Sequence, residues 1–315
     1  MTTTALVTGA AGFIGSRLAA SLLESGVDRV VGVDRLSDYY DVAIKRRNLA
    51  RIDCAAFEFV EGDLLVLDLV RLLDGVDVVF HEAAQAGVQP AWGRAFDTYV
   101  DDNIRATRRL LEAVVASGNR AKIVNASSSS VYGDVGESPV TEDRATNPLS
   151  PYGVTKLAAE QLVSAYAHGH GIDAVSLRYF TVYGPSQRPD MAFARMCTRI
   201  HQGLPIEVFG TGDQVRDFTY IDDVVRATIL AWQRPTPTAS IINIAGGSAV
   251  SLNDCIDVLA GLHGEAVERI THPHSRGDAR RTNASTARAA ELLGWFPLVS
   301  IETGLKSQFE ATDGS

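Results

Sequence analysis

The chain has 315 residues with 29 basic and 38 acidic side chains, a formal net charge of −9 at pH 7. This length leaves room for about two domains of ~150 residues and for a core that needs no disulfide or metal staples. The acidic balance argues against a protein that coats nucleic acid, because such proteins need a basic face. The excess acid is uneven: residues 1–177 carry 16 basic against 23 acidic side chains, and residues 178–315 carry 13 against 15. An anionic small molecule therefore meets less opposition in the second half.

Cysteine usage and hydropathy indicate the compartment. Cys54, Cys197 and Cys255 are widely spaced and form no CxxC pair, which is typical of packed thiols in a reducing environment. The first charged side chain is Arg17, so no basic segment precedes the first apolar run, and no apolar run approaches ~18 residues. We therefore expect a cytoplasmic protein without a membrane span.

Short β-rich runs alternate with helical stretches through the first half of the chain. The predicted strands are near-continuously apolar, as buried parallel strands are: Ala5–Thr8, Val30–Val33, Phe57–Val60, Val76–Phe80, Lys122–Ala126 and Ala174–Arg178. This alternation predicts an α/β fold, a doubly wound parallel Rossmann sheet with helices on both faces. Prolines become frequent after Arg178, which indicates a smaller, interleaved C-terminal domain. We expect residues 1–178, with a return around 221–245, to form the first domain, and residues 179–220 and 246–315 to form the second.

A glycine-rich turn, Gly9-Ala-Ala-Gly12-Phe-Ile-Gly15, follows the first predicted strand and opens a helix. Gly9 permits a tight turn, Gly12 lets a pyrophosphate approach the backbone, and Gly15 lets the helix pack closely on the strand. The helix N-terminus then faces the phosphates. The spacing is GxxGxxG and not GxGxxG, but its place between strand and helix favours a dinucleotide site over a structural loop.

Acidic residues follow the second and third predicted strands. Asp34 lies 19 residues after Gly15, where a carboxylate accepts both ribose hydroxyls and repels a 2′-phosphate, which selects NAD over NADP. Asp63 faces the adenine or caps the strand end. Arg35 beside Asp34 either softens this selection or is a solvated arginine, and we interpret it as solvated.

The segment Tyr152-Gly-Val-Thr-Lys156 opens a predicted helix after Pro148 and Pro151. Positions i and i+4 share a helix face, so the ammonium lies near the phenol. A nearby positive charge favours phenolate, and a phenol with an ordinary pKa of ~10 needs that help to act as a base. The run Ser127–Ser130 ends the fifth strand, where hydroxyls can bind a sugar oxygen or simply cap a loop.

In this order the motifs resemble the extended short-chain dehydrogenase/reductase family, in its nucleotide-sugar epimerase branch. The resemblance covers nearly the whole chain and also includes His81–Gly87, Ser127–Gly133, Arg178–Pro185, Arg216–Tyr220 and Arg276–Asp278. Within the branch, Ser37–Val42, Ala83–Gly87 and Arg188–Ala192 are most similar to the segments of UDP-glucuronate 4-epimerases. A sister UDP-hexose epimerase, acting on UDP-glucose or UDP-N-acetylglucosamine, is the alternative.

The resemblance implies NAD as cofactor and 4-epimerisation of UDP-glucuronate to UDP-galacturonate through a transient 4-keto sugar. Tyr152 then takes the proton of the 4-hydroxyl, Lys156 lowers the pKa of Tyr152 and holds the nicotinamide ribose, and Ser128 hydrogen-bonds the same sugar oxygen. The implied cofactor-binding residues are Gly9, Gly12, Phe13, Ile14, Gly15, Asp34, Asp63, Leu64, Ala83, Ala84, Gln85, Tyr152, Lys156, Tyr179 and Pro185. The implied substrate-binding residues are Ser127, Ser128, Ser129, Thr181, Arg188, Arg216, Arg276 and Asp278.

Two departures from related enzymes refine this expectation. Ser129 and Ser130 stand where dehydrating relatives carry Asp-Glu and where decarboxylating relatives keep a Glu before Val-Tyr-Gly, so we expect inversion without net loss from the sugar. Arg276 stands where the family more often has proline, which leaves its role open. Arg188 faces either the sugar carboxylate or the UDP.

Three further features have two interpretations each. The sequence His81-Glu82-Ala-Ala-Gln85 falls one ligand short of HExxH, so we expect no metal. Apolar faces on Ala95–Ser117 and Pro151–His168 predict either a homodimer interface or core packing, and Asn103 is either structural or close to the cofactor.

The alternative to an enzyme is a non-catalytic nucleotide-sensing protein with the same fold. The intact Tyr152 and Lys156 count against it.

Overall fold

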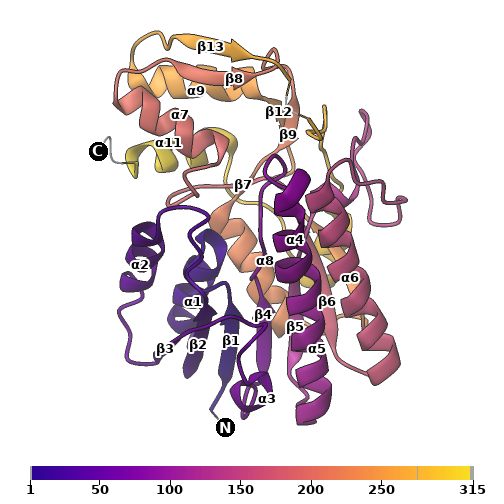
Figure 1. Ribbon diagram of the computed structural model, residues 1–315. Coiled ribbons are helices and arrows are strands. Elements are labelled where there is room, and N and C mark those ends of the chain that lie inside the picture. Colours follow the sequence, from indigo (N-terminus) through magenta and orange to yellow (C-terminus); the bar gives the residue numbers. More distant parts are fainter. Residues whose placement is uncertain (1, 275, 313–315) are drawn as a thin grey trace.

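The computed structural model describes residues 2–274 and 276–312. Seven parallel strands form the central sheet in the order β11-β6-β5-β4-β1-β2-β3 (Figure 1). Their bounds are β1 (Thr4–Thr8), β2 (Arg29–Asp34), β3 (Phe57–Glu61), β4 (Val78–His81), β5 (Lys122–Ser128), β6 (Ala174–Tyr179) and β11 (Ser240–Ile244). The winding direction reverses between β1 and β4, and in such sheets ligands bind in the crevice at that switch point.

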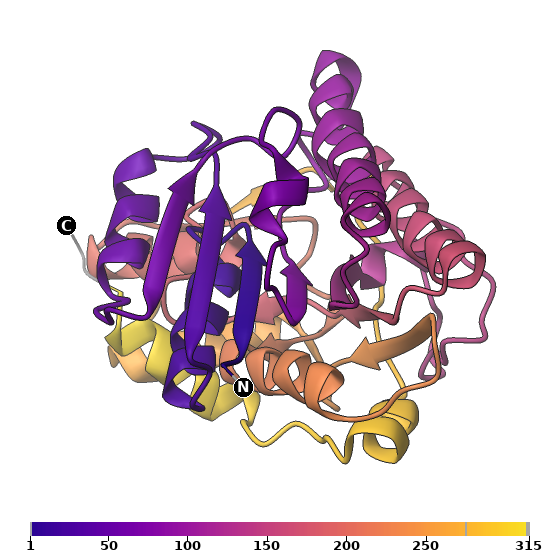
Figure 2. The same cartoon turned by 90° about the horizontal axis from the view of Figure 1, so that it is seen from below.

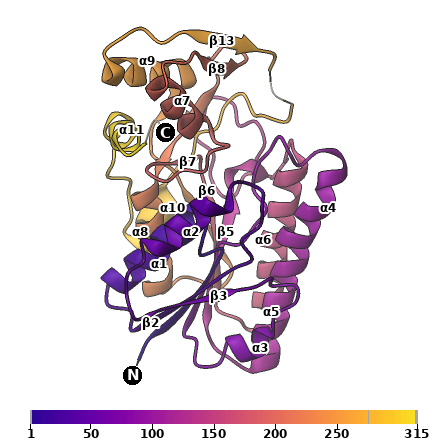
Figure 3. The ribbon, with the colours of Figure 1, turned by 60° about the vertical axis from the view of Figure 1, so that its left-hand side comes forward.

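Helices cover both faces of the sheet (Figure 3). One face holds α1 (Phe13–Glu24), α2 (Val42–Ala50) and α8 (Ile221–Gln233), and the other holds α3 (Leu69–Leu72), α5 (Ala106–Ser117) and α6 (Pro151–His170). Side chains alternate between two apolar cores, since Ala5 and Val7 pack in one and Leu6 in the other. The predicted doubly wound α/β fold is confirmed. Figure 2 shows α5 and α6 side by side along one side of the molecule.

A second group of elements, which we call the upper layer, lies beyond the carboxyl ends of the strands (Figure 1). It contains α7 (Ala192–His201), α9 (Leu252–His263), α11 (Ile301–Glu310) and the strand pairs β8 (Ile206–Phe209) with β13 (Arg269–His272) and β9 (Val215–Asp217) with β12 (Ala249–Ser251). The pair β7 (Val182–Tyr183) with β10 (Thr219–Tyr220) joins it to the sheet, and α10 (Ala287–Leu293) packs on β11. None of the described helices is long and apolar enough to cross a membrane.

The predicted helix Ala95–Ser117 is interrupted. A 3-10 turn (Gly93–Ala95) and α4 (Phe96–Tyr99) lead into a π-helical stretch (Val100–Arg105) before α5. The π-helix carries the buried Asn103, whose Oδ1 accepts from Gln85 N at 2.7 Å and whose Nδ2 donates to Thr155 Oγ1 at 2.9 Å. Asn103 therefore ties the loop after β4 to α6, as the structural interpretation of this residue expects.

The position of α6 is fixed by a buried ion pair. Ser150 caps the helix by accepting from Gly153 N at 3.1 Å. Glu160, fully buried, accepts from Arg178 Nη2 at 2.6 Å and Nε at 2.9 Å, and from Ser127 Oγ at 2.6 Å. The bidentate pair attaches α6 to β6, and the Ser127 hydrogen bond attaches it to β5.

We expect Glu160→Gln to lower the free energy of unfolding by about 3–5 kcal/mol, because Arg178 is then buried without a carboxylate. Urea unfolding followed by circular dichroism measures this. The matched control is Glu58→Gln, which removes the half-exposed partner of Arg29 and is expected to cost less than about 1 kcal/mol. Equal, small losses in the two variants would contradict the role of the buried pair.

Candidate active site

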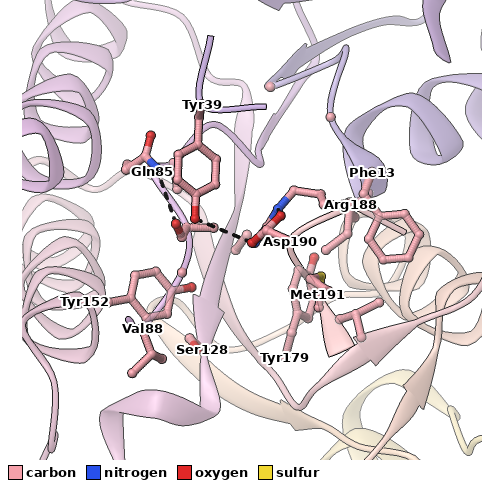
Figure 4. Close-up of a pocket in the computed structure, with 18 of the residues that line it drawn as sticks. Phe13, Tyr39, Gln85, Val88, Ser128, Tyr152, Tyr179, Arg188, Asp190 and Met191 are labelled. Atoms are coloured by element: carbon pink, nitrogen blue, oxygen red, sulfur yellow. Dashed lines mark hydrogen bonds and ion pairs between the residues drawn. The ribbon is translucent and has the colours of Figure 1, made fainter. Parts of the chain in front are cut away.

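A cavity of about 690 Å³ is lined by residues at the carboxyl ends of the sheet strands and by residues of the upper layer. It extends from the glycine-rich turn after β1, past the ends of β4, β5 and β6, to Arg216 and Asp278. Figure 4 shows its middle part, where Tyr152 and Ser128 lie across from Arg188 and Asp190.

The glycine-rich turn has no room for side chains. Gly9 has φ +71°, and a Cβ on it would lie 2.8 Å from the backbone N of Ala83. A Cβ on Gly15 would lie 2.2 Å from the carbonyl oxygen of Gly9. These contacts hold the backbone tightly at the N-terminus of α1, where peptide N–H groups favour a phosphate. The turn thus fits the pyrophosphate of a dinucleotide.

Asp34 lies at the end of β2 and lines the cavity. Its carboxylate accepts from Leu36 N at 2.8 Å and from Ala11 N at 3.2 Å, so the side chain is held in place beside the turn. The interpretation of Arg35 as solvated was wrong. Its guanidinium donates to both oxygens of Asp102 at 2.8 and 2.7 Å and to Asp63 at 3.3 Å, because the π-helix brings Asp102 over the end of β2.

Tyr152, Ser128 and Lys156 converge at the end of β5. The phenol of Tyr152 lies near Ser128, whose hydroxyl lowers the pKa of the phenol, and Lys156 Nζ donates to the carbonyl oxygen of Ala126. Burial lowers the pKa of Lys156 to about 8, against the opposing effect of the nearby Glu82 and Glu160 carboxylates. The structure therefore brings the three predicted catalytic side chains together.

The positive charge of Arg188 acts on the phenol of Tyr152. Burial raises the pKa of Tyr152, whereas the nearby Ser128 hydroxyl and the Arg188 charge lower it. The lowering of this pKa by Lys156, which the resemblance implies, stays a prediction. Arg188 donates to both oxygens of Asp190 at 2.9 Å and lies 6.0 Å from the ring centre of Tyr39 (Figure 4).

The three candidate serines have different partners. Ser127 commits its proton to Glu160, so towards a sugar it can offer only lone pairs. Ser128 accepts from Ser130 N at 3.2 Å and meets Tyr152, and Ser129 is buried in the 3-10 turn Ser129–Val131. Of the three, Ser128 is the one placed beside the phenol.

Most of the remaining predicted residues line the cavity: Gly12, Phe13, Ile14, Asp63, Leu64, Ala83, Ala84, Gln85, Tyr179, Thr181, Arg188, Arg216 and Asp278. Arg216 donates to Asp278 at 2.6 Å. Pro185 and Arg276 are not among the lining residues. Arg276 is exposed, and Gly277, with φ +77°, turns the chain between it and Asp278.

The sequence missed several lining residues, among them Glu82, Arg195 and Phe209. Arg195 pairs with Glu207, and its guanidinium lies 5.6 Å from the ring centre of Phe209. Only Glu82 had a sequence signal, as a charged residue directly after a predicted strand. Within the described part of the chain, no group of three His, Cys, Asp or Glu side chains could hold a metal ion.

Comparison with known proteins gives the family. Residues 5–245 match the NAD dependent epimerase/dehydratase family. The chain belongs to this family. It is 41% identical over 308 residues to a UDP-glucuronate 4-epimerase of Thermodesulfobacterium geofontis, with 96% of this chain and 93% of that protein covered. It is 40% identical over 304 residues to an uncharacterised UDP-glucose epimerase of Bacillus subtilis, with 96% of each covered.

A solved structure has a closely similar fold. The crystal structure of UDP-glucuronic acid 4-epimerase from Bacillus cereus in complex with UDP-glucuronic acid and NAD has a TM-score of 0.95 at 40% identity, over 98% of this chain and 99% of that chain. Membership of an NAD dependent epimerase/dehydratase family agrees with the glycine-rich turn, with Asp34 and with the Tyr152–Lys156 pair. The residues present therefore fit NAD.

Gly15→Ala is expected to abolish retention of NAD, because the new methyl group would lie within 2.2 Å of the Gly9 carbonyl oxygen and displace the turn. NAD content after gel filtration measures this. Gly261→Ala, in α9, is the control, since a Cβ there meets nothing within 4 Å. Full NAD retention by the Gly15 variant would show that the turn does not hold the cofactor.

Proposed function

We propose that this epimerase interconverts UDP-glucuronate and UDP-galacturonate by inverting C4 of the sugar. The observation that carries the proposal is the position of Arg188, whose charge acts on Tyr152. In a uronate the carboxylate carbon is bonded to C5, next to C4. A cation that faces the base for the C4 hydroxyl across the cavity can therefore also face the carboxylate, and arginine pairs with carboxylates through two hydrogen bonds.

Tyr152 is the proposed base for the 4-hydroxyl, and Ser128 binds the same oxygen. Both side chains lie at the end of β5 and already contact each other. Lys156 is proposed to hold the nicotinamide ribose, next to the Ala126 carbonyl that it now contacts. The chemistry that NAD supplies when bound is reversible acceptance of the hydride from C4. A transient 4-keto sugar follows, and its rotation allows return of the hydride to the other face.

The side chains near Tyr152 support inversion without elimination. Ser129 and Ser130 provide no carboxylate to move the protons of a dehydration. A 4-keto uronate is a β-keto acid that loses CO₂ readily, so the enzyme must hold its carboxylate out of the reactive alignment. Arg188 and Thr181 are the proposed holders, and Ser127 and Ser129 supply further oxygen atoms.

The remaining assignments are proposals of the same kind. Asp34 and Asp63 bind the adenosine half of NAD, and Arg216 and Asp278 bind the diphosphate and the uridine ribose. Residues 1–178 and 221–245 form the NAD-binding domain, and 179–220 and 246–315 form the UDP-sugar domain. Pro185 and Arg276 both lie outside the cavity lining, so we assign them no contact with NAD or the UDP-sugar.

We also propose that the protein is cytoplasmic and that it forms a homodimer. The homodimer is supported by exposed apolar side chains at Val115 on α5 and Val154 on α6.

A UDP-glucose 4-epimerase is the second candidate. The Bacillus subtilis relative carries that name at nearly the same identity. Both activities would use the same Tyr152, Ser128 and NAD site, so they differ only in what surrounds C6 of the sugar. Arg188 is the described feature that favours the uronate.

The direct test is incubation with UDP-glucuronate, UDP-glucose and UDP-N-acetylglucosamine, with products identified by NMR. We expect UDP-galacturonate as the main product and no accumulation of UDP-pentose. Tyr152→Phe is expected to lower kcat by about 10²–10⁴-fold and to keep NAD, because it removes the base alone. Turnover of UDP-glucose in preference to UDP-glucuronate would favour the second candidate.

The role of Arg188 has its own test. Arg188→Ala is expected to raise KM for UDP-glucuronate by about 10- to 100-fold, the loss of a charge-assisted pair, and to leave KM for UDP-glucose within about 3-fold. Arg216→Ala is the control, because the UDP group is common to both substrates and both should weaken alike. Equal losses for both substrates in the Arg188 variant would contradict carboxylate recognition.

A further inference from the structure

Glu82 is a partly buried carboxylate in the cavity for which the proposed reaction gives no role. It directly follows β4 and lies between the glycine-rich turn and the Tyr152–Lys156 pair. A Cβ on Gly9 would lie 3.0 Å from the carbonyl carbon of Glu82, so its backbone packs against the turn that fits the pyrophosphate. Its charge and that of Lys156 act on each other.

The carboxylate belongs to a chain of hydroxyl groups. Tyr179 OH donates to Glu82 Oε1 at 2.9 Å and lies 2.8 Å from Thr228 Oγ1, and Thr228 can donate to the Val224 carbonyl at 2.8 Å. A protonated Glu82 would donate to Tyr179, Tyr179 to Thr228, and Thr228 to Val224. Either protonation state is fully hydrogen-bonded. Burial raises the pKa of Glu82 to about 7, and the Tyr179 hydrogen bond and the Lys156 charge oppose that rise.

Sheet topology places this carboxylate in the nicotinamide half of the site. Asp34, at the end of β2, marks the adenosine half, and a dinucleotide in such a sheet crosses the switch point between β1 and β4. Glu82 directly follows β4, and its partner Tyr179 ends β6. The nicotinamide ring is positively charged when oxidised and neutral when reduced. A negative charge nearby therefore stabilises the oxidised ring selectively.

We propose that Glu82 sets the redox balance of the bound cofactor, favouring its oxidised form. The proposal rests on the proposed function and adds a determinant of how long the keto sugar persists. By opposing net reduction of the cofactor, the carboxylate favours return of the hydride to the 4-keto sugar. A short-lived keto uronate has less time to lose CO₂.

The test measures the ratio of reduced to oxidised cofactor on the enzyme by the near-ultraviolet absorbance of the reduced ring. The enzyme is held with UDP at about pH 8, where most of a carboxylate with a pKa of about 7 is ionised, and is equilibrated with a mediator dye of fixed potential. Glu82→Gln is expected to raise the ratio about 10-fold, equivalent to about 30 mV for a two-electron couple. Glu82→Asp keeps the charge and is expected to stay within about 3-fold of the parent.

Control variants separate charge from structure. Glu61→Gln removes an exposed carboxylate on β3, paired with Arg46 at 3.6 Å, and is expected to leave the ratio unchanged. Glu82→Leu is a second neutral variant in case the glutamine variant folds poorly. An unchanged ratio in the neutral variants would overturn the proposal, and so would an equal rise in the Asp and Gln variants.

The same variants distinguish this proposal from the proposed function. The mediator assay uses UDP and no sugar, so its result does not depend on which UDP-sugar the enzyme turns over. With UDP-glucuronate, Glu82→Gln is expected to release several-fold more UDP-pentose than the parent. A raised cofactor ratio with no turnover of UDP-glucuronate would support the role of Glu82 and count against the proposed substrate.

Discussion

The buried pair between Glu160 and Arg178 holds α6 against the sheet, and the geometry of the site depends on it. Tyr152, Lys156 and Glu160 lie four residues apart on one helix face. Each contacts the end of β5, at Ser128, Ala126 and Ser127 respectively. A slip of α6 by one turn, about 5.4 Å, would leave a buried charge unpaired. The pair therefore fixes the height of the phenol above the sheet.

Three arginines that line the cavity are already paired with carboxylates. Arg188 pairs with Asp190, Arg195 with Glu207 and Arg216 with Asp278. These pairs orient the guanidinium groups before a ligand binds. They also neutralise much of the positive charge that the arginines bring to the cavity. An anionic ligand must offer hydrogen bonds good enough to compete with, or add to, these carboxylates. Binding then depends more on the shape of the ligand and the geometry of its acceptor atoms than on its total charge.

The sequence predicted the features that depend on local spacing. The strand runs, the glycine-rich turn, Asp34 and the Tyr152–Lys156 pair follow from residues within about a helix turn or one β–α unit of each other. It could not place side chains that meet across the fold. Arg35 meets Asp102 across 67 residues, and Arg188 acts on Tyr152 from a loop after β7. The partner of Glu82 comes from β6, 97 residues away, so its hydroxyl chain has no local signature.

The chain passes between the sheet and the upper layer several times, through β6 to β7, from β10 into α8, and from β11 to β12. Two domains joined by a single linker can move apart, whereas two layers between which the chain crosses several times cannot rotate freely against each other. Among the residues that line the cavity, Tyr39 OH lies 3.5 Å from Asp190. We therefore expect binding and release of nucleotides to depend on local rearrangement of Tyr39 and Asp190, while the sheet and the upper layer stay in place.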